Sequence, residues 1–300
     1  MTRPQPGVLA DASRHAVYLT LHQSDAEGAR ERILSFARSR PSQVAASGQA
    51  MLMLGIGSTY WDSLYPEARP AELLPFPAME NGERVAPSTP VDLMIAVRGD
   101  DESAVYDLLR EVRAELGDAV SLIEEVRGFR YKDSRDLTGF VDGTENPAPD
   151  DRAEIALVGE FDAQFAGGSY MHLQRYEHRM RSWNQTPVAA QEQIIGRTKE
   201  DNVEFASADK SPHAHTKRTS IKDAEGRSIE IYRQSMPYGD SERQGLMFIS
   251  MSTSAEPFRQ MLHSMVFGDE QGRADDLLLF TRALTGVSLF LPSLDWLEQH

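Results

Sequence analysis

The chain has 300 residues, and its 46 Asp and Glu outnumber its 31 Lys and Arg, which gives a formal net charge of −15. It contains no cysteine, so disulfide scaffolds, thiolate metal sites, iron–sulfur clusters and cysteine nucleophiles are excluded. The acidic balance argues against a nucleic-acid partner, because phosphate contacts require clustered Lys and Arg. No stretch approaches the ~18 apolar residues that span a bilayer, and the first residues lack an apolar signal core. We therefore expect a cytoplasmic protein that contacts neither membrane nor nucleic acid.

The first half of the chain alternates apolar strands with amphipathic helices. The expected order is β-α-β-β-α-β, with strands at 15–22, 51–58, 91–98 and 120–127 and helices at 26–39 and 102–116. The helical period is clear at 102–116, where Val105, Leu108, Leu109 and Val112 fall on one face. A proline-rich stretch at 65–90 is expected to be mostly loop.

The second half repeats this order of elements. We expect strands at 169–176, 229–234, 246–252 and 286–290 and helices at 187–195 and 256–266. The pattern predicts an α+β fold of two ferredoxin-like domains, each a β-α-β-β-α-β unit with an antiparallel sheet. We place the N-terminal domain at residues 1–135 and the C-terminal domain at residues 136–300.

Between the halves lies a turn-rich segment that contains Gly139-Phe140-Val141-Asp142-Gly143. Glycine suits tight backbone or close approach to a ligand, so Asp142 is a candidate functional residue. An ordinary Asp-Gly turn in a linker explains the same pattern.

Two histidines, His213 and His215, lie in a local basic segment, residues 213–218, within this acidic chain. An H-x-H pair can place two imidazoles on one face of a strand, as metal ligands require. One of the two could instead be an axial ligand of haem iron, and a solvated loop is the plain alternative.

Charged residues on apolar elements supply three further candidates. Arg233 continues the aliphatic face of a strand through Ile229 and Ile231, where a guanidinium must be paired or serve an anion. A structural salt bridge would satisfy it equally well. Asp275 and Asp276 precede an apolar run, so they either begin a helical turn or orient a histidine elsewhere.

Together these segments resemble the dye-decolorizing peroxidases, in particular their bacterial B-type, porphyrinogen-peroxidase-like branch. Residues 139–143 match the family's G-x-x-D-G motif, and further matches follow in the family order. These matches are Gly167-Gly168-Ser169-Tyr170, Ile194-Ile195-Gly196-Arg197, His215-Thr216-Lys217-Arg218, Arg233-Gln234-Ser235-Met236-Pro237-Tyr238-Gly239 and Leu284-Thr285-Gly286. The resemblance implies the same pair of ferredoxin-like domains, with one haem b held mainly in the C-terminal domain.

The resemblance also implies a role for each matching residue. His215 corresponds to the proximal ligand of the haem iron, and Asp275 to the acid that contacts this histidine. Asp142 and Arg233 correspond to the residues on the distal side, as proton carrier and electrostatic stabiliser. Ser235 corresponds to a catalytic position at which some B-type members have asparagine. The oxidative strength of those members therefore cannot be assumed for this chain.

Two further residues correspond to cofactor contacts in the family. Arg197 matches an arginine that binds a haem propionate, and Phe248 is expected to pack against the distal haem face, with ordinary core packing as the alternative. The implied function is a peroxidase that reduces hydrogen peroxide through a ferryl intermediate and oxidises dyes, phenolics or porphyrinogens by one-electron steps.

Two other functions remain open from the sequence. The first is a haem-binding or haem-handling protein with incidental peroxidase activity, and the second is a non-haem metal enzyme that uses His213 and His215. The resemblance implies a homo-oligomer. The chain ends directly after the last expected elements, so we do not expect loading into an encapsulin shell.

Overall fold

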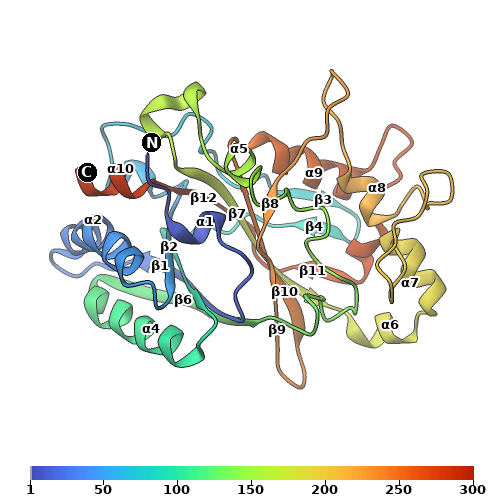
Figure 1. The fold of residues 1–300 in the computed structure, drawn as a ribbon, viewed down its shortest axis with the longest axis horizontal. Coiled ribbons are helices and arrows are strands. Elements are labelled where there is room, and N and C mark those ends of the chain that lie inside the picture. The colour runs from blue at the N-terminus through green and yellow to red at the C-terminus, as the bar shows by residue number, and fades with distance from the viewer. Residues whose placement is uncertain (1) are drawn as a thin grey trace.

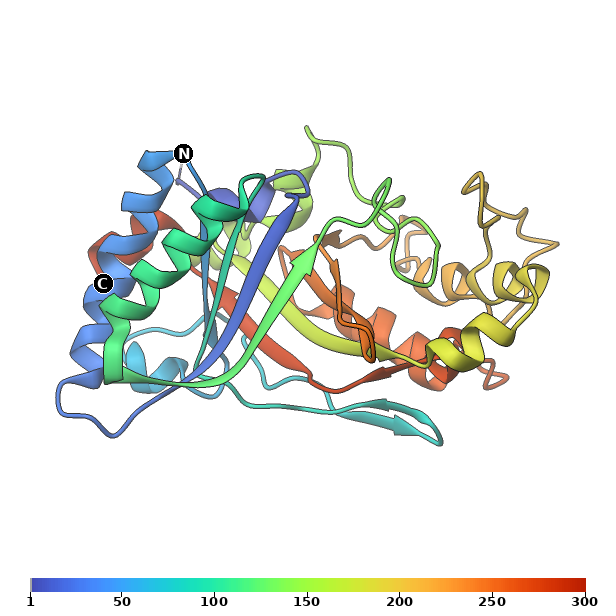
Figure 2. The same cartoon turned by 90° about the horizontal axis from the view of Figure 1, so that it is seen from below.

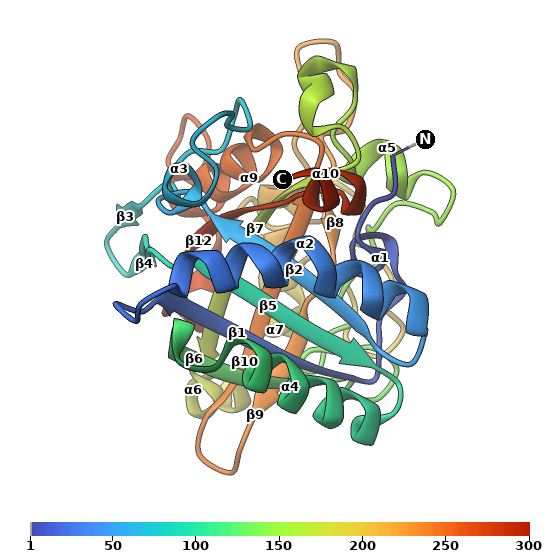
Figure 3. The same cartoon turned by 90° about the vertical axis from the view of Figure 1, so that its left-hand side faces the viewer.

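The computed structural model describes residues 2–300, and its first half contains four long strands with two helices packed on one face. These elements are β1 (His15–Gln23), α2 (Ala29–Ser47), β2 (Met51–Gly57), β5 (Leu93–Gly99), α4 (Glu102–Leu116) and β6 (Val120–Phe129). The strands lie in the order β2-β5-β1-β6. Figure 3 shows α2 and α4 lying side by side across these strands.

The helix ends follow from local side-chain and backbone chemistry. Asp101 caps α4, because its carboxylate accepts a hydrogen bond from the Ser103 N–H at 2.8 Å, and Gly117 ends the helix with φ +53°. We expected the first helix to end at residue 39, but α2 continues to Ser47. Pro41 lies buried inside this helix, so apolar packing outweighs the backbone hydrogen bond that proline removes.

The second half arranges its strands in the order β12-β7-β10-β9, with helices on the outer side. Its elements are β7 (Ser169–His178), α6 (Met180–Gln185), α7 (Val188–Ile195), α8 (His215–Thr219), β8 (Tyr232–Arg233), β9 (Met236–Gly239), β10 (Gln244–Ser252), α9 (Glu256–Phe267), β11 (Thr281–Ala283) and β12 (Val287–Leu291). The strand that we expected at 229–234 is reduced to the two residues of β8. Figures 1 and 2 show this half extending away from α2 and α4.

The strands of the two halves join into one ten-stranded antiparallel sheet instead of remaining as two separate sheets. β12 pairs with β2, β6 pairs with β9 at Gly128 and Tyr238, and pairing of β7 with β10 closes a ring. Glycine permits the close approach at the second junction, because a Cβ on Gly128 would lie 3.0 Å from the Cβ of Met236. The two halves therefore share a continuous backbone framework.

Short elements complete the chain. They are α1 (Pro6–Leu9), α3 (Trp61–Leu64), β3 (Met79–Asn81), β4 (Arg84–Ala86), η1 (Gly117–Ala119), α5 (Arg152–Ala156), η2 (Glu160–Phe165), η3 (Asp276–Leu279) and α10 (Leu294–Gln299). β3 and β4 form a hairpin within the proline-rich stretch that we expected to be mostly loop. Across residues 2–300, no helix combines the length and apolar character needed to cross a bilayer.

Candidate functional site

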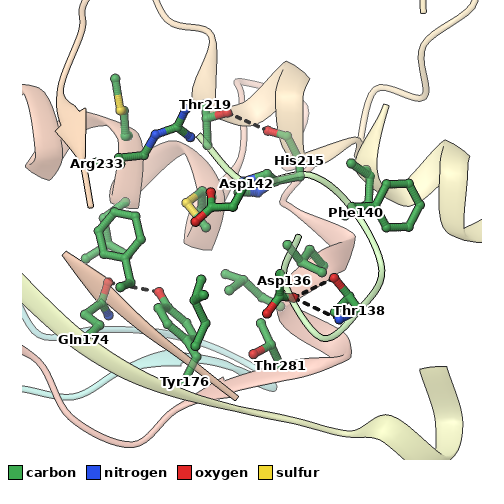
Figure 4. Close-up of a pocket in the computed structure, with 18 of the residues that line it drawn as sticks. Asp136, Thr138, Phe140, Asp142, Gln174, Tyr176, His215, Thr219, Arg233 and Thr281 are labelled. Atoms are coloured by element: carbon green, nitrogen blue, oxygen red, sulfur yellow. Dashed lines mark hydrogen bonds between the residues drawn. The ribbon is translucent and has the colours of Figure 1, made fainter. Parts of the chain in front are cut away.

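A deep, mainly apolar pocket lies in the second half of the molecule. Its walls come from the loop at 136–142, from β7, β8 and β10, and from α8, α9 and η3. The space between these walls measures about 1010 Å³, open solvent at its mouth included. Figure 4 shows Asp142, Arg233 and His215 gathered at one end of the pocket, with Gln174, Tyr176 and Thr281 at the other.

His215 is the first residue of α8, and a buried carboxylate fixes its ring. Its Nδ1 lies 2.7 Å from Oδ2 of Asp275, which is fully buried. The other oxygen of Asp275 accepts a hydrogen bond from the Leu277 N–H at 2.9 Å and so caps η3. Asp275 therefore both begins a helical turn and orients a histidine. With Nδ1 donating to the carboxylate, Nε2 of His215 keeps its lone pair for another partner.

The neighbouring candidates lie elsewhere. Asp276 binds Arg84 Nη2 at 2.9 Å, and its carboxylate is 3.8 Å from His213. His213 hydrogen-bonds the Ala274 carbonyl at 2.9 Å and is absent from the pocket walls. Within residues 2–300 no cluster of three or more His, Asp or Glu side chains could hold a metal ion, so the H-x-H hypothesis gains no support.

Asp142 lies on the loop that the sequence singled out, partly buried at the pocket wall. Its Oδ1 accepts a hydrogen bond from the Gly143 N–H at 2.7 Å, and Gly143 has φ +77°, a conformation that favours glycine. Burial raises the pKa of Asp142, whereas the positive charge of Arg233 opposes that rise. The negative charge of Asp136, on the same pocket wall, raises it further.

Arg233 lies on β8, the edge strand of the sheet, and the side chain of Asn146 holds its backbone. Asn146 accepts from the Arg233 N–H at 3.0 Å and donates to the Arg233 carbonyl at 2.7 Å. The guanidinium Nε lies 3.5 Å from the same Asn146 oxygen. Throughout the described chain Arg233 forms no ion pair with a carboxylate, so the salt bridge that we considered for it is not found.

Phe248, Arg197 and Ser235 occupy three different surroundings. Phe248 lines the pocket, and its ring centroid is 6.0 Å from that of Phe258. Arg197 lines an adjoining outer space together with Asp142 and His215, and its Nη1 pairs with Glu145 at 2.7 Å.

Ser235 lies outside the pocket, in a second cavity on the other side of Arg233, where its hydroxyl accepts from the Ile249 N–H at 3.4 Å. The structure therefore brings His215, Asp142, Arg233 and Phe248 to one pocket, with Asp275 behind His215, and leaves Ser235 and Arg197 at its margins.

Two polar residues of the site escaped the sequence analysis. Asn146, three residues after Gly143, has no predicted role, although its side chain supports the backbone of Arg233. His178 bridges Asp136 at 3.0 Å and Thr281 at 2.9 Å on the pocket wall. Burial alone would raise the pKa of Asp136, but the neighbouring His178 and the hydrogen bonds that Asp136 accepts lower it overall. The strand expected at 169–176 stops short of His178, which β7 includes, and strand periodicity could not reveal these partners.

Comparisons with known proteins identify the family of the chain. A family model for the N-terminal domain of Dyp-type peroxidases matches residues 5–130, and a model for their C-terminal domain matches residues 133–296. The dye-decolorizing peroxidase of Rhodococcus erythropolis is 38% identical over 302 residues, which cover 98% of this chain and 88% of that protein.

Two solved structures are similar along the whole chain. A dyp-type peroxidase protein of Shewanella oneidensis superposes with a TM-score of 0.94 at 48% identity, covering 100% of this chain and 99% of the other. A variant of Rhodococcus jostii DypB in complex with heme gives a TM-score of 0.94 at 35% identity, covering 98% of each chain. On these matches and this pocket, the chain belongs to the Dyp-type, or dye-decolorizing, peroxidase family.

Proposed function

We propose that this protein is a haem-dependent peroxidase that reduces hydrogen peroxide and oxidises dyes, phenolics or porphyrinogens in one-electron steps, with haem b as its cofactor. One observation supports this most directly. His215 presents a free Nε2 to an apolar pocket that also contains a carboxylate and an unpaired guanidinium, those of Asp142 and Arg233. The heme in the similar Rhodococcus jostii structure supports the choice of cofactor.

The residues present fit haem. A neutral imidazole whose other nitrogen donates to a carboxylate is a strong axial ligand, and Asp275 is fully buried beside His215. Apolar side chains such as Phe248 and Leu262 suit the faces of a porphyrin. Arg197 can contact a propionate, since a guanidinium matches a carboxylate, although Glu145 now occupies one of its nitrogens. Bound haem would supply the iron at which the peroxide oxygen–oxygen bond breaks.

Asp142 would transfer the proton in that reaction, and Arg233 would stabilise the negative charge. The Oδ2 atom of Asp142, which the Gly143 N–H leaves free, can accept a proton from the inner oxygen of hydrogen peroxide. The same carboxyl group can return that proton to the outer oxygen, which departs as water. The guanidinium of Arg233 stabilises negative charge on the departing oxygen and favours the ionised form of Asp142.

We propose the division into two ferredoxin-like domains at residues 1–135 and 136–300, with haem in the C-terminal one. The strand orders β2-β5-β1-β6 and β12-β7-β10-β9 support it, because each places the first and third strands of its unit in the middle. Every residue on the pocket wall follows residue 135, which supports the assignment of haem to the second domain. A homo-oligomer, the absence of encapsulin loading and a cytoplasmic location stay predictions.

The first experiment tests the iron ligand. Protein expressed with ample iron and haem should show a Soret band, whereas His215→Ala should fold but bind haem at least tenfold more weakly. His213→Ala is the matched control and should keep full haem occupancy, because His213 is not on the pocket wall. Full occupancy and an unchanged spectrum in His215→Ala would remove His215 as the ligand. A preparation without a Soret band but with stoichiometric zinc or iron would favour the non-haem alternative.

A second experiment separates a peroxidase from a haem-handling protein. Stopped-flow mixing of the holoprotein with one equivalent of peroxide should change the Soret band rapidly, and Arg233→Ala should slow this change by orders of magnitude. A haem-handling protein would react slowly, and Arg233→Ala would leave its rate unaltered.

A further inference from the structure

We propose that a second cavity, which lies behind Arg233 between the two halves of the chain, binds a phenol that bears a carboxylate. This proposal rests on the proposed function, since it gives the peroxidase a site for an anionic reducing substrate. The walls of the cavity come from residues 11–13, 130, 131, 134, 135, 142, 143, 146–149, 152 and 232–237. Asp142 and Arg233 line both this cavity and the first pocket, so the two spaces adjoin at these side chains.

The charge of the cavity wall is opposite to that of the whole protein. Four arginines line it, Arg130, Arg135, Arg152 and Arg233, against two carboxylates, Asp11 and Asp142. The difference, 4 − 2 = +2, stands in a chain whose formal net charge is −15. A basic concavity in an acidic protein selects anions locally even where the overall surface repels them.

Ion pairs account for only part of this positive charge. Arg152 pairs with Asp11 at 2.7 Å, and Arg135 pairs with Asp133 at 2.8 Å. Neither Arg130 nor Arg233 has a carboxylate partner among residues 2–300. Arg130 is solvent-exposed at the rim and Arg233 is half-buried at the inner end. An anion entering the cavity therefore meets two guanidinium groups that form no ion pair with a carboxylate of the described chain.

The rest of the wall suits an organic ring better than a small inorganic anion. The cavity encloses about 1110 Å³ with open solvent at its mouth included, which is far more than phosphate needs. Tyr131, Tyr232, Met236 and Pro237 supply apolar and aromatic surface. The guanidinium carbon of Arg152 stands 5.0 Å from the centroid of the Tyr232 ring, which holds that aromatic side chain in place. Aromatic surface beside unpaired cations favours an arene with a carboxylate.

A substrate bound here would lie next to the residues that activate peroxide. Each molecule of a hydroxybenzoate loses one electron and its phenolic proton. Two molecules thus supply the two electrons and two protons that convert one hydrogen peroxide into two waters. The peroxide of the proposed function is the oxidant, so no other co-reactant is needed.

Equilibrium binding to the holoprotein, measured calorimetrically without peroxide, tests the proposal. 4-Hydroxybenzoate should bind at least tenfold more tightly than its neutral counterpart 4-hydroxybenzamide. Arg130→Gln should weaken binding of the carboxylate about fivefold, and Arg130→Glu should weaken it further, while neither affects the amide. Arg110→Gln is the matched control, because Arg110 is an exposed arginine on α4, far from the cavity wall, and should bind like the wild type.

Equal affinities for the acid and the amide would overturn the proposal. So would carboxylate binding that is indifferent to Arg130, since that result would place the anion in the first pocket, which Arg130 does not line. Binding that depends on Arg130 in a protein without peroxide turnover would instead leave this site standing and remove the proposed function. With turnover present, Arg130→Gln should raise KM for 4-hydroxybenzoate and leave KM for phenol unaltered.

Discussion

Arg233 stands at the edge of the sheet, where no further strand supports its backbone. The carboxamide of Asn146 takes the place of such a strand, because it binds both the N–H and the carbonyl of Arg233. This arrangement fixes the backbone and leaves the guanidinium free of carboxylate partners in the described chain. Two hydrogen bonds thereby join the loop that contains Asp142 to the strand that contains Arg233.

Asn146→Ala should therefore displace the guanidinium of Arg233 without reducing the haem content of the pocket. We expect the rate of the reaction with peroxide to fall by about 10- to 100-fold, since a displacement of about 1 Å in a catalytic group has effects of that size. Haem content and the Soret maximum should stay those of the wild type. The control is Asn184→Ala on α6, whose exposed side chain lies outside the site and whose loss should alter neither rate nor haem content. An unaltered rate in Asn146→Ala would show that Arg233 needs no such support.

The environment of Asp142 predicts how the peroxide reaction depends on pH. Burial and the charge of Asp136 raise the pKa of Asp142 above the usual value near 3.9. Only the ionised carboxylate accepts a proton, so the rate should rise with pH as Asp142 ionises, at a higher pH than an exposed Asp would require. Arg233→Gln removes a charge that lowers this pKa, and should move the rising limb to still higher pH.

Second-order rate constants for the reaction with peroxide, measured between pH 3.5 and 8, check this prediction. The comparison is between the midpoints of the rising limbs of the wild type and Arg233→Gln, independent of their absolute rates. A midpoint that stays in place or moves to lower pH in the variant would show that another group controls the limb.

At the scale of single residues, the sequence indicated which side chains could be functional but not which residues contact them. Asp142 stands between two glycines and His215 lies two residues after His213, patterns that are visible in the printed chain. The contact of His215 with Asp275 spans 60 residues of sequence, so residue spacing alone could not choose between Asp275 and Asp276. Asn146 precedes Pro147, and an Asn-Pro pair is an ordinary turn signal, so nothing in the sequence points to its contact with Arg233.

At the scale of elements, the contact between the C-terminal end of α7 and the start of α8 helps to place His215. α7 ends at Gly196, whose φ of +93° lies in the left-handed region that favours glycine. A Cβ at this position would stand 2.2 Å from Thr216 Oγ1 and 3.3 Å from the Cβ of Ala214. Those two residues flank His215, so the end of one helix packs directly against the start of the next.

Gly196→Ala should consequently displace α8 and its histidine. We expect a loss of about 1–3 kcal/mol in the free energy of unfolding, from backbone strain and overpacking together. Haem affinity should fall as well, since His215 moves away from its place beside Asp275. Thermal unfolding and haem titration measure the two effects.

Gly226→Ala separates strain from contact. Gly226 also has a left-handed backbone, with φ +81°, but nothing lies within 4 Å of its added Cβ. It should lose only about 1 kcal/mol and keep full haem affinity. If both variants bound haem equally well, the contact with Thr216 would not be what positions α8.

Periodicity predicted the bounds of an element well where one face is buried, and less well where tertiary contacts determine those bounds. The helix at 102–116 has the expected bounds, because its apolar spacing, its cap and its terminal glycine agree. The strand expected at 229–234 shortens to β8, since β10 pairs only with Tyr232 and Arg233 of this segment and the Ile229 N–H donates instead to the Ile221 carbonyl. The hairpin of β3 and β4 turns at Gly82-Glu83, where Gly82 has φ +61°, and the surrounding prolines obscured this short turn in the sequence.

At the scale of the whole molecule, the ring of strands could not be read from the sequence. Alternation identifies which residues of a strand are buried but not which edges meet. The pairs β12–β2 and β6–β9 join segments that are far apart in the chain. This joining also creates the cavity between the halves, whose walls contain residues from both sides of position 135.

The distribution of charge over the molecule is the other large-scale feature. From the sequence, residues 213–218 form a basic exception on a repulsive surface, but Arg218 is buried and pairs with Asp269 at 3.1 Å. This segment is therefore less cationic than it reads in the sequence. The arginines of the cavity between the halves form a stronger local concentration of positive charge on this acidic protein. Long-range repulsion by the net charge of −15 and short-range attraction at the cavity then act on the same anionic substrate.

Ionic strength separates these two effects, because salt screens the long-range part most strongly. The Debye length falls from about 30 Å at 0.01 M to about 8 Å at 0.15 M salt. Over that range we expect kcat/KM for an anionic dye to rise, kcat/KM for a cationic dye to fall and kcat/KM for a neutral phenol to stay constant. In Arg130→Gln the rise in kcat/KM for the anionic dye should be steeper. The variant has less local attraction at the cavity, so salt has less attraction to screen. Steady-state rates for the three substrates at fixed pH measure this, and a fall for the anionic dye would mean that local charge at the cavity dominates approach from solution.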